Sequence, residues 1–340
     1  YTLKKDSADG RFLMWKITTK AIQKQPITGT SLGGFPAAYA ETQAEYMASG
    51  KATEQEKLVA GCPEYAFNEY LQIGLEQGLV GLALFIGWLG LLFYKGIKNK
   101  RYACCGGLMS LAIFAFSSYP LQLPEFWVVL IFLGVMSVTP DKDEIRENQA
   151  ESNGHRWGKQ IFFMGIAILG IGLFWMQKDH YKAYQQWNKA QMFYNNKAYE
   201  AALEVYEPLY PLLKHKPEFL FEAAQSLSKT GQYEKANGYL ERAVLLSSDP
   251  MLYYVMAKNE QCLGEYRQAE KHLLHAIDIL PERIYPYYLL MNLYTEPSYF
   301  QPAKLKMAID SVLTKKPKVE SSAIKEMKEK ARSMLNNTSI

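Results

Sequence analysis

The sequence predicts an all-α chain in which polytopic transmembrane helices precede a C-terminal helical-repeat solenoid. Two observations predict this fold class. Four nearly uncharged apolar runs lie in the middle of the 340 residues, and a pattern of glycine, tyrosine and alanine recurs at a fixed step after them. With 49% hydrophobic residues and four cysteines, the composition excludes a disordered or disulfide-stapled chain. The small net charge of +4 argues against a nucleic-acid partner.

The first element is a polar segment, residues 1–76, which precedes the apolar runs. Asp9–Gly10 predicts a turn, and Pro26 is expected to end the helix that follows it. That helix should bury one face at helical spacing, formed by Phe12, Trp15, Thr19 and Ile22. The chain begins with Tyr1 rather than methionine, so we expect a fragment or a processed product.

The second element is a set of four apolar runs, residues 77–176, which we interpret as transmembrane helices. One such run could be a buried core helix, but four runs separated by short polar loops are better explained by lipid, where helices satisfy their own backbone. The runs are Gln77–Tyr94, Tyr102–Tyr119, Leu123–Thr139 and Ile161–Met176.

Positive charge in the loops predicts the orientation of these helices. The loop Lys95–Arg101 and the loop Pro140–Gln160 each carry four lysines or arginines, whereas the turn Pro120–Pro124 has none. The two basic loops are therefore expected in the cytoplasm. Both polar ends, residues 1–76 and 177–340, are then expected on the outer side of the membrane.

The third element is a repeat in residues 177–340. Gly231, Tyr233 and Ala236 recur 33 residues later, as Gly264, Tyr266 and Ala269, and weaker copies contain Ala202 and Ala303. This pattern resembles the tetratricopeptide repeat, a pair of antiparallel helices. We expect three or four units between Lys182 and Lys316, a tetratricopeptide-repeat α-solenoid, with Val319–Leu335 as a capping helix. Its concave surface is expected to bind a protein partner.

Two motifs before the second apolar run resemble those of the O-antigen ligase and polymerase family. The first contains Gly10, Arg11 and Trp15, followed by Pro26 and Gly29. The family's second motif is His-Asn, nine residues and a glycine that leads into a transmembrane helix. This chain has Phe67-Asn68, nine residues and Gly78. The resemblance covers Asp6–Phe93.

The resemblance implies a membrane glycosyltransferase, a multi-pass protein of the bacterial inner membrane with both polar regions in the periplasm. Its members transfer a glycan from undecaprenyl pyrophosphate, at the outer face of the inner membrane, to a lipid A core, a growing polymer or a protein hydroxyl. They are thought to need no nucleotide sugar and no bound metal, so no cofactor is expected. Because members have more than four spans, the chain resembles their C-terminal part, beginning inside the catalytic periplasmic loop.

Arg11 and Asn68 are the motif residues with candidate chemical roles. A departing pyrophosphate develops negative charge that a guanidinium can bind through two hydrogen bonds. Arg11 matches the family's first-motif arginine; its alternative role is a surface ion pair with Asp6 or Asp9. Asn68 is either a substrate contact or the cap of the following helix.

Phe67 stands where the family has a histidine, and it can neither accept a proton nor carry charge. Three explanations remain open: a carboxylate, Glu64 or Glu69, serves as the base; arginine stabilisation alone suffices; or transfer activity has been lost. The candidate site residues are therefore Arg11, Glu64, Asn68 and Glu69.

Lipid-linked glycan transfer by a ligase or polymerase is the main functional hypothesis. A protein O-oligosaccharyltransferase is the nearest enzyme alternative, because the repeats could recruit a protein acceptor. A non-catalytic membrane-anchored scaffold for envelope polysaccharide assembly is the alternative from another class, which Phe67 favours and Arg11 opposes.

Overall fold

The computed structural model describes residues 2–139, 177–317 and 319–337, together with 164, 165, 169, 170, 172 and 175. The described chain is helical and forms two compact units. We call them the solenoid unit, Tyr1–Lys24, Gly33–Glu64 and Trp187–Ile340, and the apolar unit, Gln25–Leu32 and Tyr65–Gln186.

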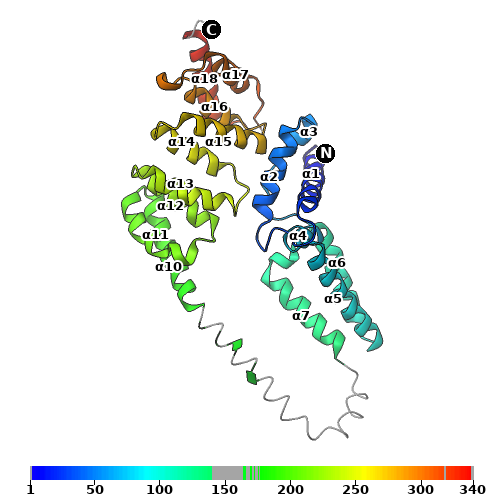
Figure 1. The fold of residues 1–340 in the computed structure, drawn as a ribbon. Coiled ribbons are helices and arrows are strands. Elements are labelled where there is room, and N and C mark those ends of the chain that lie inside the picture. The colour runs from blue at the N-terminus through cyan, green and yellow to red at the C-terminus, as the bar shows by residue number, and fades with distance from the viewer. Residues whose placement is uncertain are drawn as a thin grey trace, which may run out of the picture. The chain divides into compact units, whose positions relative to one another are not determined.

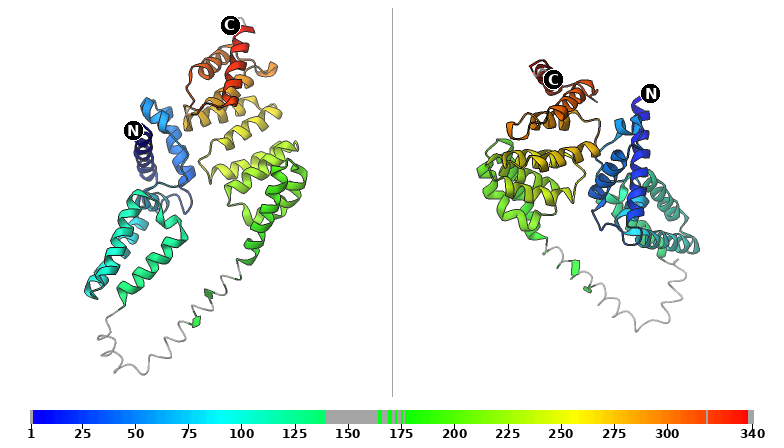
Figure 2. Two further views of the ribbon diagram at one scale, coloured as in Figure 1. Left: turned by 180° about the vertical axis from the view of Figure 1, so that it is seen from behind. Right: turned by 45° about the horizontal axis from the view of Figure 1, so that its top comes forward.

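The apolar unit consists of short and long helices joined by tight turns (Figures 1 and 2). Its elements are α4 (Glu69–Glu76), α5 (Gly78–Lys98), α6 (Tyr102–Ser117), η1 (Pro120–Gln122) and α7 (Pro124–Val138). Leu92, Leu108 and Leu130 pack between α5, α6 and α7. Outward-facing apolar side chains remain exposed, among them Leu84 (70%) and Val128 (68%).

Helix α5 is longer than the neighbouring helices α6 and α7. With 21 residues, α5 is about 32 Å long, enough to cross a hydrocarbon core of about 30 Å. Helices α6 and α7 have 16 and 15 residues, so α5 alone among the described helices is long and apolar enough to span. The four-span arrangement stays a prediction. The loop Pro140–Gln160 and most of the run Ile161–Met176 lie outside the described residues.

The solenoid unit contains the N-terminal helices and the repeats (Figure 1). Its elements are α1 (Thr2–Lys24), α2 (Phe35–Ala48), α3 (Glu54–Val59), α10 from Trp187 on (the whole helix is Lys178–Asn195), α11 (Tyr199–Leu213), α12 (Pro217–Lys229), α13 (Tyr233–Val244), α14 (Met251–Cys262), α15 (Tyr266–Ile279), α16 (Ile284–Leu293), η2 (Pro297–Tyr299), α17 (Pro302–Thr314) and α18 (Ser322–Asn337).

The repeat pattern is confirmed as successive pairs of packed helices, α12–α13, α14–α15 and α16–α17. Ala236 and Ala269, on the second helix of their pairs, are completely buried because a methyl group lets two helices approach closely. Gly231 and Gly264 turn the chain between paired helices with φ of 80° and 79°, which glycine adopts without strain.

The outermost repeat departs from the pattern. Ala303, expected in the core, is exposed because α17 begins at Pro302 and puts it on the first turn. Leu305 occupies the fourth position of α17, as Ala236 does in α13, and is 1% exposed. Helix α18 packs against α17, with Ala331 buried in the final core cluster. It occupies most of the segment Val319–Leu335, whose role as a capping helix stays a prediction.

Helix α1 corrects two predictions. It runs unbroken through Asp9–Gly10, where a turn was expected. Its buried face consists of Leu13, Ile17 and Ala21, one turn apart, whereas Phe12 is 63% exposed. The predicted face is therefore wrong: apolar residues recur on both sides of this helix, and packing against α2 and α3 selects the other one.

The N-terminal helices share a core with the repeats because α2 packs against α15. At this contact the Gln43 side chain is completely buried. Its Nε2 donates to the carbonyl oxygens of Gly61 (3.0 Å) and Ile279 (2.9 Å), and its Oε1 accepts from the Tyr39 hydroxyl (2.6 Å). Ser248 Oγ also donates to the Pro63 carbonyl oxygen, at 3.1 Å.

We expect Gln43→Ala to destabilise the solenoid unit by about 2–4 kcal/mol, because the buried Tyr39 hydroxyl and Ile279 carbonyl and the half-buried Gly61 carbonyl lose their partner. The control is Gln55→Ala: Gln55 Nε2 also makes two hydrogen bonds, to Asp6 and Asp9, but is exposed. That variant should change stability by less than about 0.5 kcal/mol. Urea unfolding followed by tryptophan fluorescence measures both. Equal losses of stability in the two variants would contradict a special contribution from the buried hydrogen bonds of Gln43.

Candidate functional site

The four predicted site residues fall in different units. Arg11 and Glu64 belong to the solenoid unit, Arg11 exposed on α1 and Glu64 exposed in the segment after α3. Asn68 and Glu69 belong to the apolar unit, where both are buried at the start of α4. The structure thus brings Asn68 and Glu69 together on one helix end.

Asn68 caps α4. Its Oδ1 accepts a hydrogen bond from the Leu71 backbone N–H at 3.1 Å, and its extended backbone is typical of a cap residue. Only 4% of Asn68 is exposed. The capping alternative is therefore present in this structure.

Glu69 ties α4 to the turn between α6 and α7. Its carboxylate accepts from the Leu121 backbone N–H at 2.7 Å and from Gln122 Nε2 at 3.3 Å, and 1% of the residue is exposed. Burial raises the pKa of Glu69, and the two hydrogen bonds oppose that shift. Both of its oxygens have partners, so the carboxylate holds two segments together.

One side of α4 forms a buried polar row of Glu69, Gln72 and Glu76. Gln72 Oε1 accepts from the Ala66 backbone N–H at 2.8 Å, and Gln72 Nε2 donates to Glu76 Oε1 at 3.0 Å. Glu76 is 8% exposed. These contacts fix the chain that leads from the second motif into α5.

Phe67 lies in an aromatic cluster of the apolar unit. Its ring meets the Tyr119 ring edge-on, with centroids 4.8 Å apart, and Tyr65 stacks on Tyr119 at 5.3 Å. Phe67 has a φ of 50°, which is uncommon for a residue other than glycine. At the position where the resemblance implies a histidine, this chain thus has a phenylalanine ring packed against Tyr119. Sequence reasoning missed Tyr119, which belongs to neither motif.

The two motif glycines touch. A Cβ on Gly29 would lie 2.5 Å from the backbone of Glu76 and of Gly78, and a Cβ on Gly78 would lie 2.0 Å from the Ile27 carbonyl oxygen. Their φ values are 68° and 70°. At both positions glycine is therefore required by contact and by conformation.

Backbone hydrogen bonds join the first-motif loop to the break between α4 and α5. They satisfy groups that would otherwise be orphaned at these two helix ends. The bonds run from Thr30 N to Leu75 O (2.9 Å), from Ser31 N to Glu76 O (2.9 Å) and from Leu79 N to Pro26 O (2.7 Å).

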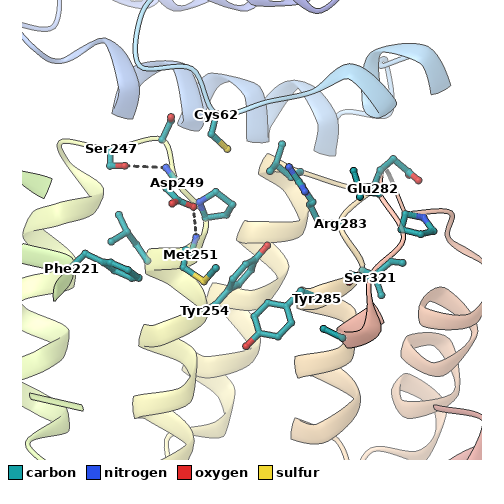
Figure 3. Close-up of a pocket in the computed structure, with 18 of the residues that line it drawn as sticks. Cys62, Phe221, Ser247, Asp249, Met251, Tyr254, Glu282, Arg283, Tyr285 and Ser321 are labelled. Carbon is teal, nitrogen blue, oxygen red and sulfur yellow. Dashed lines mark hydrogen bonds between the residues drawn. The ribbon is translucent and has the colours of Figure 1, made fainter. Parts of the chain in front are cut away.

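The solenoid unit contains a groove of about 980 Å³. The sequence predicted a binding surface on the repeats but not that residues before the apolar helices would help to line a cavity there. It is lined by the N-terminal ends of α12, α14, α16 and α18, and by Cys62 and Glu64. Figure 3 shows Cys62 facing the side chains of Asp249 and Tyr254 across this groove. Within the described residues no three histidine, cysteine or acidic side chains gather as a metal site would require.

Comparison with protein families identifies two regions. The family described as O-Antigen ligase matches residues 2–86, and the family described as Anaphase-promoting complex, cyclosome, subunit 3 matches residues 195–276. The first match contains both motifs, with Arg11, Gly29, Asn68 and Gly78. The chain therefore carries an O-antigen-ligase-like region followed by repeats of the tetratricopeptide type. No curated protein matches the chain.

Several solved structures are similar to the repeat part. MamA from Desulfovibrio magneticus is 17% identical, with a TM-score of 0.35, over 44% of this chain and 76% of that one. The Yersinia enterocolitica type III secretion chaperone SycD, in complex with a YopD peptide, is 19% identical, with a TM-score of 0.30, over 37% and 90%. A Podosopora anserina protein with TPR-like repeats is 16% identical, with a TM-score of 0.37, over 46% and 89%.

We expect Gly29→Ala to prevent normal accumulation of the folded protein, because its methyl group would overlap the backbone at the α4–α5 break. Gly33→Ala is the matched control, since Gly33 also has positive φ (75°) but nothing lies within 4 Å of its Cβ position. That variant should cost only about 1 kcal/mol of backbone strain. Membrane yield and elution volume in detergent report the difference. Equal yields for both variants would show that the glycine contact is dispensable.

Proposed function

We propose that this protein transfers a glycan from undecaprenyl pyrophosphate to an acceptor at the periplasmic face of the bacterial inner membrane. The observation that carries the proposal is the O-antigen-ligase match over residues 2–86, which contain both motifs. The contact between the motif glycines supports it, because it gives a structural reason for their occurrence together.

The proposed parts are residues 1–76 as the catalytic loop, 77–176 as four transmembrane helices and 177–340 as the periplasmic solenoid. Arg11 binds the donor pyrophosphate and stabilises the charge that develops as the glycosidic bond breaks. Glu64 is exposed, so we assign it the base that takes the acceptor proton. Asn68 and Glu69 hold the start of α4, through the cap and the link to η1.

A protein acceptor is the second candidate, and one observation favours it. Glu64 lines the groove together with the N-terminal ends of the repeat helices. A protein bound by the repeats would therefore lie beside this carboxylate. Lipid A core and a growing polymer remain the acceptors that the ligase and polymerase functions require.

We expect Arg11→Ala to slow glycan transfer about a hundred- to thousandfold, the effect of removing one charge-stabilising donor from a transition state. Arg11→Lys should recover only part of the rate, because an ammonium keeps the charge but loses the two-point contact. The control is Arg332→Ala, because Arg332 is also exposed but lies on α18; this variant should transfer glycan at the normal rate. Transfer is measured with purified lipid-linked glycan in proteoliposomes. Near-normal transfer by Arg11→Ala would refute the phosphate role.

The proposed orientation predicts which thiols a membrane-impermeant maleimide labels in intact cells. Cys262 is exposed and Cys62 half-buried, and both lie in regions proposed as periplasmic. Both should react, Cys262 faster, whereas Cys104 and Cys105 on α6 stay protected by lipid. A Cys262→Ser variant identifies the faster signal. Labelling of Cys262 only after permeabilisation would reverse the topology.

A further inference from the structure

The groove of the solenoid unit has walls from two distant parts of the sequence. One wall is the segment Gly61–Glu64, and the other is formed by the repeat helices. The segment is held in place by Gln43 through the Gly61 carbonyl oxygen and by Ser248 through the Pro63 carbonyl oxygen. The groove is therefore a built feature and not an open face of the repeats.

The floor of the groove is apolar. Phe221 from α12, Met251 from α14, Tyr285 from α16 and Ile324 from α18 line it, so that each of these four alternate helices contributes one large side chain. Figure 3 shows Phe221, Met251 and Tyr285 directed toward the cavity. Met251 is 39% exposed. Such a row offers anchor sites for apolar side chains of a bound molecule.

The rim of the groove is acidic. Its charged lining consists of five carboxylates and one guanidinium, that of Arg283. Glu282 is paired with Lys315 at 2.8 Å, and Glu222 accepts hydrogen bonds from neighbouring helices. The remaining carboxylates are those of Glu64, Glu218 and Asp249. All three are exposed, and none has a cationic partner among the described ion pairs.

We propose that this groove binds an extended polypeptide segment in which lysine or arginine alternates with apolar residues. Helices α12, α14, α16 and α18 alternate with other helices in the chain, but each contacts the next of the four. At about 8–10 Å between contacting helices, their four ends span about 24–30 Å, the length of about eight extended residues. Alternation sends successive side chains to opposite sides, apolar ones to the floor and basic ones to the carboxylate rim. We assign this segment to a protein acceptor, and that assignment rests on the proposed function. The binding of the segment by the groove does not depend on the proposed function.

The test measures fluorescence anisotropy of a labelled octapeptide of alternating leucine and lysine with the purified chain in non-ionic detergent at low salt. A peptide with glutamate in place of lysine should bind at least about tenfold more weakly. Glu218→Lys should weaken binding of the lysine peptide about tenfold, and Asp249→Asn, which keeps the acceptor for the Met251 N–H, about threefold. Raising the salt concentration should weaken binding of the lysine peptide.

The control variant is Glu234→Lys. Glu234 is an exposed first-turn acid of α13, as Glu218 is of α12, but it does not line the groove. It should change the affinity by less than about twofold. Equal binding of the two peptides, an equal effect of Glu218→Lys and Glu234→Lys, or displacement of the peptide by an uncharged oligosaccharide such as maltoheptaose would overturn the proposal.

Transfer assays keep the two proposals apart. Charge-dependent peptide binding by a protein that transfers no glycan would retain the groove and reject the transfer function. Glycan transfer to a lysine-rich protein acceptor that Glu218→Lys leaves unchanged, with peptide binding also unchanged, would retain the function and reject the groove.

Discussion

The close contact between the first-motif loop and the break between α4 and α5 is the constraint on which the ligase-like region depends. Gly29 and Gly78 both have positive φ, and neither position has room for a Cβ. Because the loop supplies hydrogen-bond partners to both helix ends, α4 and α5 meet without orphaned backbone groups. This contact sets the start of the apolar helix α5 and fixes α4, with Asn68 and Glu69 at its other end. Two motifs separated in sequence are thus one structural feature.

A second constraint joins the ligase-like region to the repeats. Helix α2 and the segment Gly61–Glu64 pack against the solenoid through the buried Gln43 and through Ser248. Solenoids usually build their core from neighbouring repeats alone. Here residues of the ligase-like region complete one wall of the groove. Helices α1 to α3 and the repeats therefore fold together as one compact unit.

The sequence predicted those elements whose signal is local. Periodic small residues located the central repeat pairs, and hydrophobic length located α5. The prediction of the buried face of α1 was wrong, because Phe12 and Leu13 are both apolar and only tertiary packing determines which of them is buried. The motif spacing singled out Gly29 and Gly78 but could not show that they touch, since 48 residues separate them. The groove was unpredictable for the same reason: Glu64 and Glu218 meet one cavity only after folding.

The central claim is lipid-linked glycan transfer, and reconstitution tests it most directly. The purified protein would be placed in liposomes with an undecaprenyl-pyrophosphate-linked glycan and, in parallel samples, with lipid A core, a polysaccharide and a protein acceptor. The account predicts that labelled glycan appears covalently on at least one acceptor, that undecaprenyl pyrophosphate is released in equal amount, and that no nucleotide sugar is needed. A folded, reconstituted protein that leaves the donor intact with every acceptor would contradict it and favour the scaffold function.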